Sequence, residues 1–328
     1  MPKGANQKMK ILYLMDMLLN DTDENRGLTM QEILFRLENS GVSAERKSIY
    51  DDLDVLRQYG LDVLTKKGKS TEYYIGSRDF ELPELKLLVD AVQSSKFITQ
   101  RKSTELIRKL ESLTSKDQAK TLQRQVYVNN RIKTQNESIY YNVDSLHTAI
   151  ANRKKASFKY FDYDVDKNRV YRRDGERYVV NPLGLSWDDE NYYLITYNEK
   201  YDDFAHYRVD RMTNINVEDE QMIANEKTKA FNVAEYCKLI FGMFDGSDER
   251  VELAVDNSLI NIMIDRFGKD VMMYRLDDQN VRVIANIKSA GTFFGWLAQF
   301  GDLVRIDSPD NLRGEYIIFL KKIVEKNK

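Results

Sequence analysis

The chain has 328 residues, enough for two to three domains. Hydrophobic residues make up 42% of it, which excludes wholesale disorder, and a formal net charge of −2 excludes a uniformly basic nucleic-acid binder, although local basic patches remain possible. The single cysteine excludes a disulfide framework within the chain, and two histidines argue against a multi-histidine metal site, so we expect no metal and no cofactor.

The first 78 residues predict three helices and a hairpin. Apolar residues recur at helical spacing from residue 11 to residue 19, then after Thr29, which can cap a second helix ending at Gly41, and after Ser43, which can cap a third ending at Gly60. Two short strands, residues 62–66 and 72–75, flank a basic turn. Three helices followed by a basic hairpin predict a winged helix-turn-helix.

Residues 82 to about 128 predict a charged helical connector, broken near residues 97–102. A short helix at 143–152 follows, and the pattern then changes to a period of two. Strands are expected at 156–161, 178–181, 185–187, 192–197 and 206–209, which favours a small barrel.

The last hundred residues mix helices and strands. Helices are expected at 230–241, 259–267, 292–300 and 312–324, and strands at 250–255, 271–276, 281–287 and 303–306. This alternation predicts a ferredoxin-like α+β domain. The fold class is therefore α+β and multidomain, with ranges 1–78, 79–141, 142–222 and 223–328. No stretch approaches the length of a membrane helix and no apolar leader follows the start, so we expect a cytoplasmic protein without a membrane partner.

Residues 181–211, NPLGLSWDDENYYLITYNEKYDDFAHYRVDR, combine aromatic and basic side chains on short strands. Convergent rings and guanidinium groups suit a flat anionic ligand such as a nucleotide or nucleic acid. We expect the ligand-binding residues to be Ser186, Tyr193, His206, Arg208 and Arg211. By strand alternation Arg208 and Arg211 face opposite sides, so a bulge or turn near Asp210 is needed to bring them together.

The tripeptide Tyr192-Tyr193-Leu194 resembles the signature of the WYL-domain family of bacterial transcription regulators, with tyrosine in place of tryptophan. The surrounding Pro182-Leu183 and the segment from Tyr207 to Arg211 fit the same pattern, and residues 43–56 are similar to the family's recognition helix. Residues 241–255 and 265–268, Trp296, and residues 308–310 resemble its C-terminal extension. The resemblance implies a winged helix-turn-helix, a Sm-like small β-barrel that senses a nucleotide or single-stranded nucleic-acid effector, a C-terminal extension and a homodimer. We therefore expect a DNA-binding transcriptional regulator.

The predicted DNA contacts lie at the start of the third helix and on the hairpin. With Ile49, Leu53 and Leu56 as its buried face, the outward residues meet base edges or phosphates, and the hairpin lysines contact the backbone. The predicted set is Ala44, Arg46, Lys47, Ser48, Tyr50, Lys66, Lys67 and Lys69, with Asp51 able to accept from a cytosine amino group. Residues 1–78 hold twelve basic and twelve acidic residues, so bulk charge does not favour duplex DNA.

Other interpretations remain open for several of these residues. Tyr193 and Leu194 could be barrel core, Asp210 and Arg211 could form a structural ion pair, and His206 could be a surface residue. We expect His147 to be structural and Trp296 to be core, with Arg305 and Arg313 the basic candidates of the last domain for reaching a ligand across a dimer.

Enzymatic motifs are weak. Residues 68–71, GKST, lack the upstream glycine of a phosphate-binding loop and precede a predicted strand. Cys237 with His206 could form a thiol–imidazole pair, but an apolar helical context favours an inert thiol. We expect no enzyme. The alternative function is a nucleic-acid-sensing accessory protein whose N-terminal domain makes mainly protein contacts.

Overall fold

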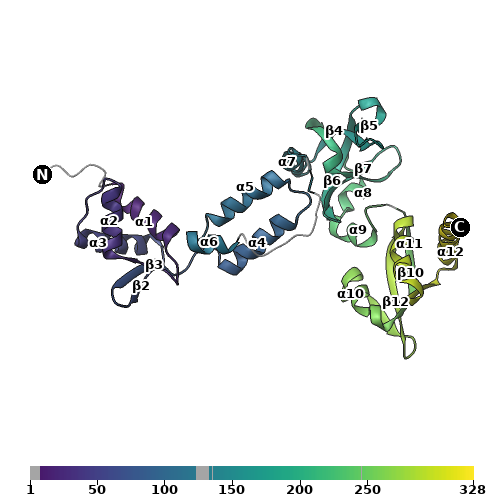
Figure 1. The fold of residues 1–328 in the computed structure, drawn as a ribbon. Helices are drawn as coiled ribbons and strands as arrows, with labels where there is room; N and C mark the ends of the chain where they lie inside the picture. The colour runs from purple at the N-terminus through teal and green to yellow at the C-terminus, as the bar shows by residue number, and fades with distance from the viewer. Residues whose placement is uncertain (1–7, 123–132, 135, 245) are drawn as a thin grey trace. The chain divides into compact units, whose positions relative to one another are not determined.

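The structure is a computed structural model that describes residues 8–328 except 123–132, 135 and 245. It divides into two compact units, residues 1–137 and residues 138–328. Both combine α-helices with antiparallel β-strands (Figure 1), so the predicted α+β class is confirmed. The four finer domain ranges stay a prediction.

The first unit begins with three helices packed on a small sheet. The helices are α1 (Lys10–Asp21), α2 (Met30–Asn39) and α3 (Arg46–Tyr59). The strands β1 (Leu28–Thr29), β2 (Val63–Lys67) and β3 (Thr71–Ile75) pair antiparallel in the order β1-β3-β2. Leu14, Leu18, Ile33, Leu37, Ile49 and Leu53 are almost fully buried among these elements. The predicted helices and hairpin are therefore present, and β1 adds a short third strand.

The two helix starts differ in how well the sequence predicted them. Thr29 caps α2 in a capping box, in which its hydroxyl accepts from the Glu32 backbone while the Glu32 carboxylate accepts from the Thr29 backbone. The prediction that Ser43 caps α3 was wrong, because the helix begins at Arg46 after Glu45 with no side-chain cap. Val42 is fully buried, so the segment after it is held on the core before the helix can start.

Three further helices complete the described part of the first unit: α4 (Leu82–Ser94), α5 (Gln100–Glu111) and α6 (Lys116–Leu122). They share a small apolar core centred on Leu85, Val89 and Leu122. The predicted break falls between α4 and α5, and residues 123–128 of the predicted helical stretch lie outside the described residues. An ion pair from Arg26 Nη1 to Asp117 Oδ2 at 2.7 Å joins α6 to the loop after α1.

A curled half-barrel sheet forms the first part of the second unit, with helix α7 (Ile139–Ala151) packed against it (Figure 1). Its strands are β4 (Lys154–Tyr163), β5 (Arg169–Tyr171), β6 (Tyr178–Asp188), β7 (Asn191–Asn198), β8 (Asp203–Arg208) and β9 (Met212–Gln221). The order is β5-β4-β6-β7-β8, and β9 pairs with β4. The two strands predicted within residues 178–187 are one strand, β6, with a register shift between Pro182 and Gly184.

Two opposite faces of this sheet are covered differently. One face packs against α7 through Phe158, Leu194 and Met212, which are fully buried. The other carries Ile195, which packs against Tyr236 and Ile240 of the segment after the sheet. This alternation places Tyr207 on the α7 side and its neighbour Arg208 on the opposite side.

The last part of the chain builds a second antiparallel sheet. Helices α8 (Glu226–Ala230) and α9 (Val233–Leu239) lead into β10 (Ser247–Asp256), α10 (Ile260–Phe267), β11 (Met272–Arg275), β12 (Asn280–Ser289), α11 (Gly291–Ala298), β13 (Val304–Ser308) and α12 (Asp310–Lys326). The strand order is β11-β12-β10-β13. The helix predicted over residues 230–241 is present as α9 but is shorter. It begins after Asn232, whose Oδ1 accepts from the backbone of Ala234, and Ala230 ends the preceding α8.

Candidate functional site

Four of the five predicted ligand residues lie on one face of the half-barrel sheet. The strand register places Ser186 opposite Tyr193, and Tyr193 opposite Arg208, in one row across β6, β7 and β8. His206 lies two residues before Arg208 and so shares its face. Strand alternation had placed His206 with Arg208, and the register adds Ser186 and Tyr193 to the same face.

Arg208 is held in a fixed orientation by its neighbours. Its Nε and Nη2 donate to the two Asp210 carboxylate oxygens at 3.0 and 2.9 Å, and Nη2 also donates to Asn191 Oδ1 at 2.7 Å. The hydrogen bond to Asp210 raises the pKa of Arg208. The Arg208 backbone N–H donates to the Tyr160 hydroxyl at 3.2 Å. This guanidinium group is a pre-positioned anion site, partly neutralised by its own carboxylate.

Arg211 reaches this region because the chain turns immediately after β8. Residues Val209–Arg211 form a short 3-10 turn, the turn near Asp210 that the alternation argument required. Arg211 Nη1 lies 3.1 Å from Asp162 Oδ1, so the alternative of an ion pair between Asp210 and Arg211 was wrong: Asp210 pairs with Arg208 instead.

Tyr160 lies between these charged groups. Burial raises the pKa of its hydroxyl, opposed by the hydrogen bond from Arg208 and by the positive charges of Arg211 and Arg172. Arg172 also donates to Asp162 at 2.5 Å, and this hydrogen bond, together with Arg211, lowers the pKa of the Asp162 carboxyl. Three guanidinium groups and two carboxylates therefore surround one buried phenol.

Helix α9 covers the Ser186 end of the row. The Cys237 thiol donates to Ser186 Oγ at 3.2 Å, and Ser186 is only 9% exposed. Burial raises the pKa of the Cys237 thiol, which keeps it protonated and unreactive. The ring of His206 lies 5.6 Å from that of Tyr236, also on α9.

Sequence reasoning missed one charged pair beside this face. Asp188, at the end of β6, is half-buried, and burial raises its pKa while the charge of Arg266 opposes the rise. Arg266 comes from α10, donates to the Ile240 carbonyl at 2.5 Å and lies 3.9 Å from the Phe241 ring centroid. The sequence offered only the resemblance of residues 265–268 to a family motif, with no role for the arginine.

The remaining candidates of the second unit lie in structural or surface positions. Trp296 packs among Phe241, Phe267 and Phe300. His147 is exposed on α7. Arg305 pairs with Asp307 at 2.8 Å and Arg313 with Asp310 at 2.7 Å, so both are held by local carboxylates.

The predicted DNA-contacting side chains of α3 separate into two groups. Arg46, Lys47, Tyr50 and Asp51 are exposed, whereas Ile49, Leu53 and Leu56 are buried as predicted. Ser48 instead turns toward α1, where its hydroxyl accepts from the Lys10 ammonium group. That ammonium also pairs with Asp52 at 2.8 Å. Ala44 lies before the helix and packs against the core rather than on the first turn.

The basic hairpin matches its prediction closely. Lys66 and Lys67 lie on β2 and are exposed, and Lys69 is exposed in the turn before β3. Thr71 begins β3, so the GKST string leads into a strand rather than the helix of a phosphate-binding loop. Arg57 Nε donates to the Val63 carbonyl at 2.8 Å and so ties the hairpin to α3.

The described ranges contain no group of three or more histidine, cysteine, aspartate or glutamate side chains placed to hold a metal ion. Among the same residues, no helix combines the length and the apolar character that crossing a bilayer requires.

Comparison with known proteins identifies one domain. Residues 141–217 match the model of the WYL domain. No curated protein matches the chain. Proteasome accessory factor B/C (PafBC) of Arthrobacter aurescens is 17% identical, with 96% of this chain and 46% of that chain covered and a TM-score of 0.28. A CRISPR Cas-related protein is 12% identical, with 75% and 71% covered and a TM-score of 0.36. The chain thus spans less than half the length of the PafBC structure.

Proposed function

Because residues 141–217 form a WYL domain, we propose that this chain is a DNA-binding transcriptional regulator whose half-barrel senses a nucleotide or nucleic-acid ligand. In this proposal the first unit begins with a winged helix-turn-helix that binds duplex DNA. The C-terminal part, with its strand order β11-β12-β10-β13, is a ferredoxin-like extension. The protein acts by binding rather than catalysis, as a cytoplasmic homodimer.

One observation carries the DNA-binding part of the proposal. The first half of α3 presents Lys47, Tyr50 and Asp51 to solvent while its opposite face is buried in the three-helix core. A helix fixed in this way can enter a major groove with its first turns toward the base edges. The exposed lysines of the β2–β3 hairpin would then contact the phosphate backbone beside it.

Fewer residues can contact DNA than the sequence predicted, because the Ser48 hydroxyl accepts a hydrogen bond from Lys10 and Ala44 packs on the core. The exposed cations are Arg46, Lys47, Lys66, Lys67 and Lys69. If all of them contact phosphates, the logarithm of affinity falls against the logarithm of salt with a slope of about −4 to −5 per protomer.

Duplex binding over a salt series tests this assignment, with DNA from the chain's own promoter region. Lys47→Ala and Lys67→Ala should each weaken binding and reduce the salt slope by about one. Lys109→Ala, at an exposed position on α5, is the matched control and should leave both unchanged. Unchanged binding in the Lys47 and Lys67 variants would remove the winged-helix assignment.

The sensing part rests on Arg208 and Arg211, which flank Tyr160 and are oriented by Asp210 and Asp162. Fixed guanidinium groups bind phosphate oxygens in a bidentate manner. Tyr193, opposite Arg208, would contact the base. Combined Arg208→Ala and Arg211→Ala should therefore weaken oligonucleotide binding, and unchanged affinity for every nucleotide and oligonucleotide tried would show that this site is wrong.

Regulation requires the ligand to favour one conformation of the dimer over another. The duplex salt series with and without candidate nucleotides measures this coupling directly. Light scattering of the full chain measures the oligomeric state, and a monomer at the concentrations of DNA binding would contradict the homodimer.

The second candidate is a nucleic-acid-sensing accessory protein whose N-terminal domain binds protein. The observation in its favour is the outer face of α3, where Tyr59 is 79% exposed and Val55 48% exposed beside the carboxylates of Asp51 and Asp54. Apolar and acidic groups on this face suit a protein surface better than phosphates. This second function would be favoured if the chain bound no duplex DNA at any salt concentration but still bound single-stranded oligonucleotides.

A further inference from the structure

A cavity of about 360 Å³ opens at the half-barrel sheet, and its lining includes Tyr178, Val180 and Tyr207 of the core beside α7. Its lining comes from β6, the end of β7, the turn into β8 and the short segment before β6, with Lys155 of β4 and Tyr207 of β8. Three basic side chains line it, Lys155, Arg173 and Lys200, against one carboxylate, Glu199. Its volume falls within the range of small-molecule sites.

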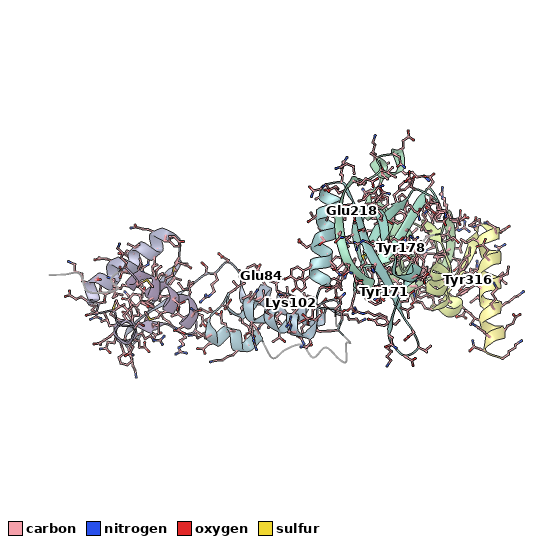
Figure 2. All side chains as sticks on the ribbon, turned by 90° about the horizontal axis from the view of Figure 1, so that it is seen from above. Glu84, Lys102, Tyr171, Tyr178, Glu218 and Tyr316 are labelled. Atoms are coloured by element: carbon pink, nitrogen blue, oxygen red, sulfur yellow. The ribbon has the colours of Figure 1, made fainter. Side chains whose placement is uncertain are left out.

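Arg173 is the distinctive residue of this cavity. Its guanidinium carbon lies 4.0 Å from the centroid of the Tyr178 ring, and that ring stacks on Phe158 with centroids 5.7 Å apart and an interplanar angle of 1°. Figure 2 labels Tyr178 among the strands of the sheet. The guanidinium group therefore lies against a buried aromatic pair.

The backbone around Arg173 is held in an uncommon conformation. Arg173 and Asp174 both have φ of 51°, followed by Gly175 with φ of 84°. Consecutive left-handed non-glycine residues are rare and are found where the surroundings impose them. The turn therefore directs Arg173 over the ring at a conformational cost.

The charge of Arg173 has no carboxylate partner among the described residues, in contrast to its neighbour Arg172, which pairs with Asp162. Lys155 pairs with Glu220. Lys200 has no ion pair in the described part of the chain, and its ammonium group lies 5.2 Å from the centroid of the Tyr201 ring. Two cations of the cavity are therefore available to an anion.

Aromatic groups lie beside these cations. The Tyr201 ring is 69% exposed, and Tyr207 lies edge-on to Tyr178 with ring centroids 5.6 Å apart. The hydroxyls of Tyr178 and Tyr207 have no hydrogen-bond partner within the described ranges. Exposed rings stack nucleobases, and phenolic hydroxyls donate to phosphate or base acceptors.

We propose that this cavity is a second ligand site of the WYL domain and binds a nucleotide. Arg173 and Lys200 contact the phosphate, and Tyr201 contacts the base. The inference rests on the proposed sensing function for the class of ligand, but it places that ligand in a cavity whose lining includes neither Arg208 nor Arg211. The bound phosphate and base come either from a free nucleotide or from one nucleotide of a single strand, because both carry these groups.

Calorimetric titration of the full chain with adenosine monophosphate, adenosine, pyrophosphate and a short oligothymidylate tests the proposal. Arg173→Ala should weaken binding of adenosine monophosphate at least tenfold, and Lys200→Ala should weaken it severalfold. Tyr201→Ala should weaken adenosine monophosphate but not pyrophosphate. Arg169→Ala is the matched control, because Arg169 also lies over a ring, that of Phe161 at 4.6 Å, but outside the cavity. The oligothymidylate distinguishes a single strand from a free nucleotide.

Variants of the two sites separate the two proposals. Loss of binding in Arg173→Ala with binding retained in the Arg208→Ala and Arg211→Ala double variant supports the second site. The reverse result overturns it and leaves the proposed function standing. A wild-type chain that binds none of the phosphate-bearing probes also overturns it, whereas duplex DNA binding is judged separately by the salt series. Covalent labelling by 8-azidoadenosine monophosphate, mapped to residues 194–207, gives a readout that does not depend on folding of a variant.

Discussion

Replacement of Asp210 by asparagine should strengthen binding of an anionic ligand at the Arg208 face. The carboxylate accepts from Arg208 Nε and Nη2 at 3.0 and 2.9 Å, so it neutralises the guanidinium group that the ligand needs. Asparagine keeps an oxygen that can accept from Arg208 but removes the negative charge. Arg208 also keeps its 2.7 Å hydrogen bond to Asn191, which preserves its orientation.

The size of the effect follows from the charges and their exposure. A phosphate on the outer edge of Arg208 would lie about 7 Å from the carboxylate, where repulsion between unit charges is about 2.4 kcal/mol at an effective dielectric constant of about 20. Arg208 and Asp210 keep 31% and 23% of their side-chain surface exposed. Solvent screening therefore reduces the expected gain to about 1 kcal/mol, or about fivefold in affinity.

Calorimetric titration with a short oligothymidylate at two salt concentrations measures this gain. The gain should shrink at high salt because it is electrostatic. Asp219→Asn makes the same charge change at an exposed position of β9 and is the matched control. An Asp210→Asn variant that folds as the wild type but binds no more tightly would refute the assumption that the ligand contacts Arg208.

Three further predictions concern stability. Gly184→Ala would place a Cβ 2.3 Å from a methyl carbon of α9, so urea denaturation should show a loss of about 1–3 kcal/mol. Lys10→Met leaves a half-buried carboxylate without its ion pair and should destabilise the first unit by about 2–3 kcal/mol in the same assay. Hydrogen bonds from Lys120 and Arg26 lower the pKa of Asp117 to about 2. Because the folded-state pKa is the lower one, this stabilisation is complete above the ordinary value of 3.8 and is lost as pH falls toward about 2, so Asp117→Asn should flatten the acid side of a Tm-against-pH profile.

The parts of the fold that the sequence predicted have strong periodic patterns. Helices α1 to α3 each bury one apolar face, which fixes their period. Strand β7 buries both faces, with Leu194 on one and Ile195 on the other, so its sequence is a short continuous apolar run. Strands β5 and β9 were missed because little of either is buried: β5 is fully exposed, and only Met212 of β9 is buried. Their positions depend on pairing with β4, which local sequence does not encode.

The site could be predicted only as far as strand alternation reaches. Alternation grouped His206 with Arg208 and required the turn near Asp210, whereas the position of Tyr193 opposite Arg208 comes from the strand register. It could not assign carboxylate partners, because Asp162 lies 49 residues from Arg211 in sequence and meets it only through the curl of the sheet. For the same reason Ser48 was expected to face DNA, whereas its partner Lys10 comes from another helix.

The cover that α9 forms over the half-barrel sheet has a consequence for handling the protein. Ile195 is fully buried only because Tyr236 and Ile240 pack on it. A fragment that ends after residue 222 would keep every strand of that sheet but would expose the hydrophobic surface around Ile195. Exposed hydrophobic patches of this kind promote aggregation. A soluble sensor fragment therefore has to extend past residue 243, so that it includes α9 and the residues that pack on the sheet.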